Sequence, residues 1–465
     1  MNKPADLGNQ ALQASVIPVE AYISPEYARA EAEKLWRKVW LQAGRVEDLP
    51  EVGCYITYDI GHDSILIVRV AEGDAANGAN GCIKAYRNVC THRGRRLVDT
   101  PAGQRNARGK RRNFVCGFHA WTFELDGTAG SIAHKDAWGP ALCDSVTRLG
   151  EVQCDTWAGF VWINQDPEAE PLRDYLEPAA AMLDPFRLQD MRARWRKWTV
   201  FDCNWKVALE AFNETYHVPG THPEFTQFGD FTGWGRPQGK HSHIGYDAPE
   251  GLDENKAKLR LGIGDPRVST AEMQKYTWEG VNTNTTQTLV DVAQTLPDVL
   301  PEDTPPAEVS RYWLETARRI DEERGVVWPK VDSETVGASG TSWQIFPNQQ
   351  IGHAVNNMLC YHARPFGSDP DKCYFEVAVY ELFPEGQVPE TEWVYADPDQ
   401  FPHVLRQDFS NMAAVQQGMK TGGYAGNIPN PVAEGAVLCL HRNLARYMGT
   451  GMPRPLETLT EESAS

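Results

Sequence analysis

This chain of 465 residues contains no run of about 20 apolar residues, so we expect no helix that crosses a membrane. Residues 1–15 lack a basic segment followed by an apolar core, and we therefore expect no secretory signal and a cytoplasmic location. Positive charge is scarce, because 45 Lys and Arg stand against 63 Asp and Glu and leave a net charge of −18. Such an acidic surface argues against nucleic acid or an anionic membrane as a partner.

The ten cysteines show no spacing typical of a disulfide framework, so we expect reduced thiols. Two of them lie beside histidines, in Cys90-Thr-His92 and Cys116-Gly-Phe-His119. Two thiolates and two imidazoles are the ligand set of a Rieske [2Fe–2S] centre, in which the Cys hold one iron and the His the other. A structural zinc site and unrelated core residues are the alternatives, but zinc modules more often pair Cys with Cys and His with His. The pattern favours a one-electron relay, and a relay implies a second centre that consumes electrons.

The two Cys-His pairs are separated by a stretch, residues 101–112, that is polar and basic. We expect a solvated loop there, since a loop lengthens at small entropic cost and leaves both pairs free to meet. The functional alternative is a docking patch for an acidic ferredoxin or reductase.

A second candidate metal site lies in the segment 204–223, which contains Glu210, Glu214, His217 and His222. The two His are five residues apart, a spacing that a straight helix does not aim at one point, and we expect the intervening Pro-Gly pair to break the helix. Two His and one carboxylate form the facial triad of non-haem Fe(II) oxygenases. The best candidate for the carboxylate is Asp408, although an acid on an amphipathic helix is usually a solvated charge.

Taken together, these motifs resemble the α (oxygenase) subunit of Rieske non-haem iron ring-hydroxylating oxygenases. The resemblance covers nearly the whole chain and rests on C-T-H and C-G-F-H, then N-W-K with E-x-x-H-x₄-H, then the late Gln-Asp. It implies an α+β protein in which an all-β Rieske domain precedes a helix-grip catalytic domain with a central antiparallel sheet. It also implies one [2Fe–2S] Rieske cluster and one mononuclear Fe(II), with Asp408 as the third iron ligand.

The same resemblance gives roles to two acids. Glu214 takes the position of a carboxylate that bridges a cluster His of one subunit and an iron His of the next, where the family more often has Asp. Glu210, four residues earlier, is expected on the same helical face as a supporting acid. The alternative for both acids is a solvated charge on the helix surface.

The implied function is that of a terminal oxygenase. It would use O₂ and electrons from a separate NAD(P)H-dependent reductase, directly or through a ferredoxin, to hydroxylate or dihydroxylate an apolar ring substrate, either aromatic or a polycyclic terpenoid or steroid-like acid. A monooxygenase that dealkylates O- or N-alkyl groups or attacks a quaternary amine is the alternative, and a non-enzymatic Rieske electron carrier is the alternative of another class. The family also implies a homotrimer, with or without a small β subunit. The sequence has no flavin or nicotinamide fingerprint, as expected if the reductase is separate.

Along the chain we expect an N-terminal helical segment at 1–44 that packs on the catalytic domain, the Rieske domain at 45–165 and the catalytic domain at 166–465. The predicted helices are 24–44, 171–186, 205–216, 306–324, 400–420 and 430–448, and the predicted strands lie mainly within 53–70, 80–88, 190–203 and 341–382. The Gly- and Pro-rich segment 225–340 is the expected pocket lid. Its candidate apolar walls are Phe225, Phe228, Phe231 and Trp234.

Overall fold

The computed structural model describes residues 12–228, 233–246 and 264–457. These residues form two compact units, one built from residues 28–176 with 366–368 and the other from the described parts of 1–27, 177–365 and 369–465. The domain boundaries expected after residues 44 and 165 stay predictions. Among the described helices, none is both long and apolar enough to cross a bilayer.

The smaller unit is built on an antiparallel seven-stranded sheet, and its all-β character confirms the prediction. The strand order is β2-β10-β9-β5-β4-β3-β6. The strands are β2 (Leu41–Arg45), β3 (Cys54–Ile60), β4 (Asp63–Arg69), β5 (Ile83–Arg87), β6 (Arg108–Lys110), β9 (Glu151–Trp157) and β10 (Phe160–Asn164). A separate hairpin of β7 (Asn113–Val115) and β8 (Thr122–Glu124) lies between them in sequence.

Two sequence predictions about this unit are wrong. Part of the expected loop at 101–112 is strand β6, which pairs antiparallel with residues 54–56 at the edge of the sheet. Three exposed residues are too few to show a strand period, so only the pairing partner reveals the strand. The helix expected at 24–44 consists of α2 (Pro25–Glu31) and a π-helical turn, Ala32–Trp36, because residues 41–45 pair with β10 instead.

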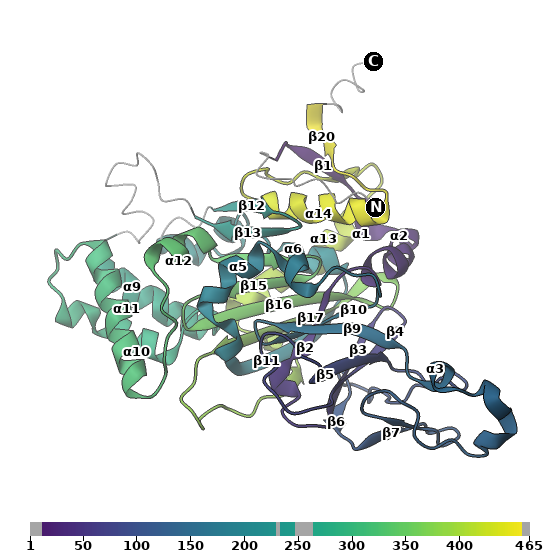
Figure 1. The fold of residues 1–465 in the computed structure, drawn as a ribbon. Helices are drawn as coiled ribbons and strands as arrows, with labels where there is room; N and C mark the ends of the chain where they lie inside the picture. The colour runs from purple at the N-terminus through teal and green to yellow at the C-terminus, as the bar shows by residue number, and fades with distance from the viewer. Residues whose placement is uncertain (1–11, 229–232, 247–263, 458–465) are drawn as a thin grey trace. The chain divides into compact units, whose positions relative to one another are not determined.

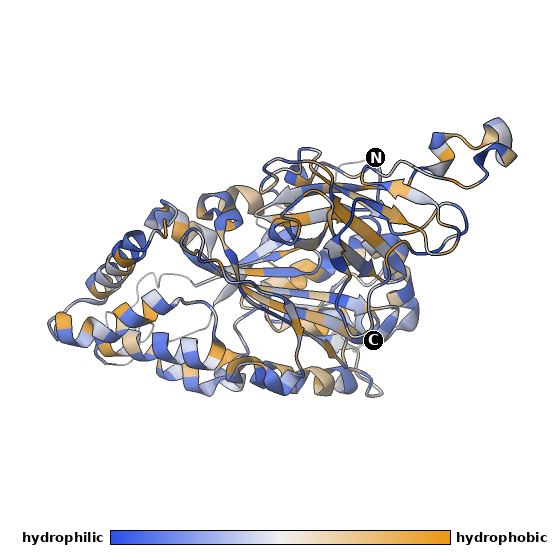
Figure 2. Cartoon of the chain, turned by 90° about the horizontal axis from the view of Figure 1, so that it is seen from below, coloured by the Kyte–Doolittle hydropathy of each residue, from blue (hydrophilic) through white to orange (hydrophobic). Residues whose placement is uncertain are grey.

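The larger unit holds an eight-stranded sheet of order β12-β13-β14-β15-β16-β17-β11-β18. Apart from the parallel pair β11–β18, the neighbours whose register is given run antiparallel. Helices α6, α13 and α14 accompany this sheet, so the helix-grip architecture is confirmed. Figure 2 shows hydrophobic residues gathered along several strands, whereas hydrophilic and hydrophobic residues alternate along the helices.

These elements have the following bounds: β11 (Arg192–Phe201), β12 (Trp234–Gln238), β13 (His241–Gly245), β14 (Ser342–Ile345), β15 (Gln349–His353), β16 (Asn357–Phe366), β17 (Asp369–Glu381), β18 (Trp393–Tyr395), α6 (Trp205–Glu210), α13 (His403–Met419) and α14 (Gly435–Met448).

A three-stranded sheet joins the two ends of the described chain. β1 (Ser15–Pro18) pairs on one side with β19 (Gly426–Asn427) and on the other with β20 (Arg454–Pro455). Figure 1 shows β1 beside β20 above α14. This pairing places helix α1 (Glu20–Ile23), which follows β1, in the same unit as α6 and α14.

The segment expected to be a Gly- and Pro-rich lid is largely helical. Besides the predicted helix α11 (Pro306–Glu323), it contains α9 (Pro266–Tyr276), α10 (Gln287–Val299) and α12 (Ser333–Ser339), and Figure 1 shows α9, α10 and α11 packed together. Asp265, Thr286 and Asp332 cap three of these helices through their side chains. The caps were present in the sequence, but the many Gly, Pro, Asn and Thr residues around them favoured a loop assignment.

Candidate functional site

The two Cys-His pairs lie on neighbouring loops of the smaller unit. Each loop is closed by its own backbone hydrogen bonds: the Cys90 N–H donates to the Arg95 carbonyl at 2.8 Å, and the Cys116 N–H donates to the Trp121 carbonyl at 2.8 Å. Both thiols are buried, and the rings of His92 and His119 lie edge to face with centroids 4.6 Å apart. The fold therefore brings together all four residues that the sequence analysis selected.

The chemistry of this donor set fits a metal cluster. The Nδ1 atom of His92 is buried without a hydrogen-bond partner, while its ring stacks on Trp121 at a centroid distance of 4.7 Å. Burial raises the pKa of the Cys90 thiol. Burial also works to raise the pKa of Cys116, but the backbone N–H groups of Phe118 and His119 outweigh it and lower that pKa. N–H groups directed at a sulfur stabilise a thiolate, the form that binds metal.

A second set of candidate ligands lies in the larger unit. Within the described ranges, His217, His222 and Asp408 offer ligand atoms that all lie within 4.8 Å of one another.

That second group confirms that the three residues predicted as iron ligands come together. His217 and His222 flank a single helical turn, α7 (Val218–Thr221), as its N-cap and C-cap. The turn includes Pro219 and Gly220, so the expected break at Pro-Gly is wrong. The chain leaves the helix at His222, where φ is −124° and ψ is 56°. This change of direction lets two imidazoles at i and i+5 face one point.

Asp408 reaches the same point from helix α13, and it is buried rather than solvated. Its Oδ1 atom lies 2.8 Å from His222 Nε2 and 3.4 Å from His217 Nε2. Burial works to raise the pKa of Asp408, but the two imidazoles outweigh it and lower that pKa. A buried carboxylate shared by two imidazoles stabilises positive charge, which suits a divalent cation at this place.

Each imidazole is oriented by a side chain on its other nitrogen. His217 Nδ1 lies 2.6 Å from Glu214 Oε1, and His222 Nδ1 lies 2.8 Å from Gln407 Oε1. Burial works to lower the pKa of His217, but hydrogen bonds with Asp408 and Glu214 outweigh it and raise the pKa to about 10. Gln407 was missed in the sequence, although its position directly before Asp408 was visible.

Glu210 does not share a helical face with Glu214, because α6 ends at Glu210 and the chain then forms turns. The expected spacing argument is therefore wrong, although both acids line the same cavity. Glu210 instead contacts Tyr22 and His441, two buried residues from the opposite ends of the chain that the sequence gave no signal to select.

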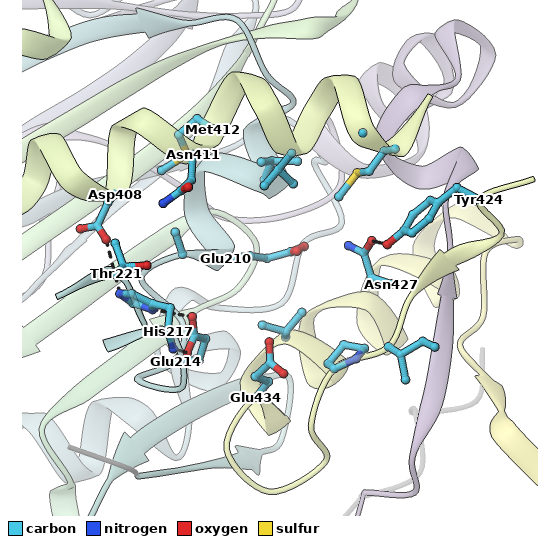
Figure 3. Close-up of a pocket in the computed structure, with 18 residues that line it drawn as sticks. Glu210, Glu214, His217, Thr221, Asp408, Asn411, Met412, Tyr424, Asn427 and Glu434 are labelled. Carbon is cyan, nitrogen blue, oxygen red and sulfur yellow. Dashed lines mark hydrogen bonds and ion pairs between the residues drawn. The ribbon is translucent and has the colours of Figure 1, made fainter. Parts of the chain in front are cut away.

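Two cavities of the larger unit share His217 and Asp408 in their lining, and His222 lines one of them. One, of about 640 Å³, is lined by Glu210, Glu214, His217, Asp408 and Glu434 together with apolar residues of α13 and α14. Figure 3 shows Asp408, His217 and Glu214 at one end of it, Tyr424 and Asn427 at the other, and Glu210 between them.

The other cavity, of about 480 Å³, is mostly apolar and borders helix α9 and the sheet. Phe225 lines it, as expected from the sequence, together with Ala211. Phe228 packs behind Phe225, and Trp234 packs on His243, so neither belongs to the wall of this cavity. Phe231 lies outside the described residues.

Two family models match the chain. The one described as ring hydroxylating alpha subunit (catalytic domain) matches residues 186–450, and the one described as Rieske [2Fe-2S] domain matches residues 39–147.

Curated relatives match over part of their length. The glycine betaine monooxygenase oxygenase subunit of Chromohalobacter salexigens is 30% identical over 47% of this chain and 46% of its own. The carnitine monooxygenase oxygenase subunit of Escherichia coli is 31% identical over 46% of this chain and 54% of its own, and the large oxygenase component of the Pseudomonas putida naphthalene 1,2-dioxygenase system is 32% identical over 44% of each. The matches thus span about half the length of these relatives.

Solved structures show the same fold over nearly the whole chain. A quaternary ammonium Rieske monooxygenase in complex with L-carnitine has a TM-score of 0.61 at 18% identity, covering 96% of this chain and 99% of its own. Naphthalene 1,2-dioxygenase with indole bound has a TM-score of 0.60 at 18% identity, covering 99% of this chain and 98% of its own.

Proposed function

Since this chain belongs to the family of ring-hydroxylating oxygenase α subunits, we propose that it is the terminal oxygenase of a multicomponent Rieske system. It uses O₂ and two electrons from a separate NAD(P)H-dependent reductase to hydroxylate or dihydroxylate its substrate. One observation carries this proposal: His217, His222 and Asp408 converge between two cavities, in a chain that also brings the Cys90, His92, Cys116 and His119 side chains together.

The cofactors follow from the two donor sets. Cys90 and Cys116 would hold one iron of the cluster and His92 and His119 the other, while His217, His222 and Asp408 would hold the mononuclear Fe(II). The cluster supplies one-electron transfer and the mononuclear iron supplies a site where O₂ is reduced beside the substrate.

The side chains around the mononuclear site keep its imidazoles in the right tautomer. Glu214 and Gln407 offer only acceptor oxygens to the Nδ1 atoms of His217 and His222, so each Nδ1 carries the proton. Each Nε2 lies on the side of Asp408, and the proton that the raised pKa of His217 keeps there would be released when a metal ion takes its place. Neutral imidazoles fixed in this way are the form that binds a metal ion.

The cavity of about 480 Å³ is the substrate site in this proposal. Phe212 and Tyr361 stack within it at a centroid distance of 3.9 Å, and Val281 and Leu359 add apolar surface. Its described lining contains no Lys or Arg. An apolar ring therefore fits it better than a substrate whose carboxylate needs a cationic partner.

A quaternary amine is the second candidate substrate. The relatives named for glycine betaine and carnitine favour it, and aromatic faces such as those of Phe212 and Tyr361 attract a quaternary ammonium group. Both of these amines also carry a carboxylate, for which the described lining offers no cation.

The partners in this proposal are an electron donor and further copies of the chain, with or without a small β subunit. Phe118 and Trp138 lie beside the cluster histidines and are 56% and 42% exposed. Such exposed aromatic side chains suit a docking surface. In a head-to-tail trimer this surface would meet the Glu214 side of the next subunit, and Glu214 would link the two metal centres. The basic edge strand β6 is the candidate contact for an acidic ferredoxin or reductase.

Product analysis with labelled oxygen tests the function. The purified protein, loaded with iron and supplied with a surrogate reductase, NADH and ¹⁸O₂, is incubated with aromatic, terpenoid, steroid-like and quaternary-amine panels. We expect mass spectrometry to find ¹⁸O in a ring product. Formaldehyde release from the amines alone would move the assignment to the monooxygenase, and a red-brown protein that consumes no substrate-dependent O₂ would support the electron carrier.

A further inference from the structure

A cluster of three polar side chains lies behind the wall of the larger cavity. The Tyr22 hydroxyl is 3.1 and 3.0 Å from the two carboxylate oxygens of Glu210 and 2.9 Å from His441 Nε2. The same His441 nitrogen is 2.6 Å from Glu210 Oε1. Tyr22 is fully buried and His441 is 1% exposed, so their bonds to Glu210 are shielded from solvent. We call Tyr22, Glu210 and His441 the carboxylate triad.

The hydrogen atoms of the triad can be assigned from its donors and acceptors. Burial, reinforced by the nearby Glu210 charge, raises the pKa of Tyr22 well above its usual value, so its hydroxyl keeps its hydrogen. The hydroxyl therefore donates to Glu210. The remaining contact joins His441 Nε2 to Glu210 Oε1 at 2.6 Å, a distance over which one proton can pass between the two groups.

Glu210 is the member of the triad that lines the cavity. Glu210 lines the cavity of about 640 Å³ that also reaches Glu214, His217 and Asp408, whereas neither Tyr22 nor His441 belongs to its described lining. Figure 3 shows the Glu210 side chain extending into the cavity between the ends marked by Asp408 and Tyr424. A cavity of this size, lined by the carboxylates of Glu210, Glu214, Asp408 and Glu434 among apolar residues, has room and hydrogen-bond partners for water molecules, which carry protons over several ångströms. Glu210 is thus the member through which a proton can leave.

The reaction in the proposed function needs a source of protons. Hydroxylation converts substrate, O₂, two electrons and two protons into alcohol and water, and dihydroxylation converts the same inputs into a cis-diol. The reductase supplies the electrons but not the protons at the site. Since the substrate cavity is mostly apolar, the protons must enter by a polar route.

We propose that Glu210 delivers protons into the larger cavity during O₂ reduction, with His441 as the proton reserve and Tyr22 as the positioning residue. This inference rests on the proposed function. In each transfer the Nε2–H bond of protonated His441 breaks as an O–H bond forms on Glu210, and that O–H bond then breaks as a water molecule in the cavity takes the proton, which leaves neutral His441 and the Glu210 carboxylate. Cavity water returns the proton to the pair between turnovers.

Other titratable groups face Glu210 across the same cavity, and the test must separate them. They are Glu214, Glu434, His217, Asp408 and Tyr424. Burial, together with the charges of Glu214 and Glu210, raises the pKa of Glu434. Tyr424 donates to Asn427 at 2.7 Å, so Tyr424→Phe removes a hydroxyl from the cavity while all three members of the triad stay in place.

The main experiment compares Glu210→Gln and Glu210→Ala with the wild-type holoenzyme. Glu210→Gln keeps the size of the side chain but cannot release a proton, and we expect the rate of product formation to fall about 100-fold, with iron content and cluster absorbance unchanged. In Glu210→Ala, added formate or acetate is expected to restore part of the rate, since a small acid fits the cavity. If Glu210 only held α1, α6 and α14 together, added formate or acetate would not restore the rate of Glu210→Ala. Wild-type rates in Glu210→Gln, or no rescue of an intact Glu210→Ala, would overturn the proposal.

Tyr22→Phe supplies an independent readout and a second route if the Glu210 variants do not fold. Loss of one donor to the carboxylate is expected to shift the pH profile of product formation towards higher pH, while Tyr424→Phe leaves the profile in place. In the iron-free protein, the infrared carboxyl band assigned by Glu210→Gln is expected to move in Tyr22→Phe. An unmoved band and an unchanged profile would refute the role of the triad. The infrared measurement needs no catalytic turnover, so it tests the triad by itself. If the wild-type protein forms no product, the proposed function is wrong, whatever the infrared result.

Discussion

The two metal sites of this protein are built in opposite ways. The cluster ligands come in two short pairs, each on a loop closed by its own backbone hydrogen bonds. The mononuclear site joins His222 to Asp408, which lies 186 residues later on another helix. The first site needs two loops of one small unit to meet, while the second needs the larger unit to be folded. We therefore expect the sites to respond independently to substitution.

The largest expected effect separates the two sites completely. His217→Ala removes one of three iron ligands, so we expect iron loss at that site and no detectable product, while the red-brown cluster absorbance stays at the wild-type level. Cys90→Ala should do the reverse, because a missing thiolate prevents cluster assembly and leaves the three ligands intact. Visible absorption and iron analysis measure both. Loss of cluster colour in His217→Ala would show that the sites are coupled.

Substitution of a residue that orients an iron ligand should have a smaller effect, a weaker metal affinity at the mononuclear site alone. Gln407→Leu removes the acceptor for His222 Nδ1, and loss of such a partner weakens metal affinity about 10–100-fold. Titration of the iron-free protein with Fe(II) measures this change. Gln417→Leu is the matched control, since Gln417 is exposed on the same helix away from the histidines. Equal affinities in both variants would contradict the orienting role of Gln407.

Core substitutions test whether the units lose their sites separately. Leu66→Ala opens a cavity in the core that also contains Cys90 and Cys116, at a cost of about 2–5 kcal/mol. We expect the cluster absorbance to be lost at a lower temperature, with Fe(II) binding at the other site unchanged. Leu296→Ala, in the buried core between α10 and α11, should destabilise the larger unit and leave the cluster transition in place. Parallel shifts in both variants would mean one cooperative unit.

The smallest expected effect concerns a strained backbone position in a cluster loop. Ala120 adopts a φ of 57° between His119 and Trp121, a conformation that costs a non-glycine residue about 1–2 kcal/mol. Ala120→Gly relieves the strain but adds freedom to the unfolded chain, so we expect a net gain of about 0.5–1 kcal/mol. Thermal unfolding followed by cluster absorbance measures it. A lower midpoint would show that the methyl group contributes packing that outweighs the strain.

Local patterns in the sequence were sufficient to predict an element or motif wherever the residues that determine it lie within a few positions of one another. The Cys-His pairs, the start of α2 at Ser24-Pro25, strands β3 to β5 and helices α11, α13 and α14 were all predicted near their observed positions. In each case the capping residues or the spacing of apolar residues predicts the element, and no contact with a distant segment is needed.

The predictions were wrong where contact with a distant segment of the chain determines the local structure. Residues 41–45 became a strand because β10 pairs with them, and residues 108–110 because β3 does. Helix α6 ends at Glu210, so Glu214 turns to His217 while Glu210 meets Tyr22 and His441. The same reason holds for Gln407, whose role depends on a histidine 185 residues away.

The sequence by itself determined the ligand types, their pairing in short motifs and the α+β class, because these depend on local spacing. Only the tertiary structure decided that Asp408 is buried between the two histidines, that two cavities meet there and that Glu210 belongs to a triad. Those facts depend on residues that are brought together from distant parts of the chain when packing overcomes the entropy of closing long loops.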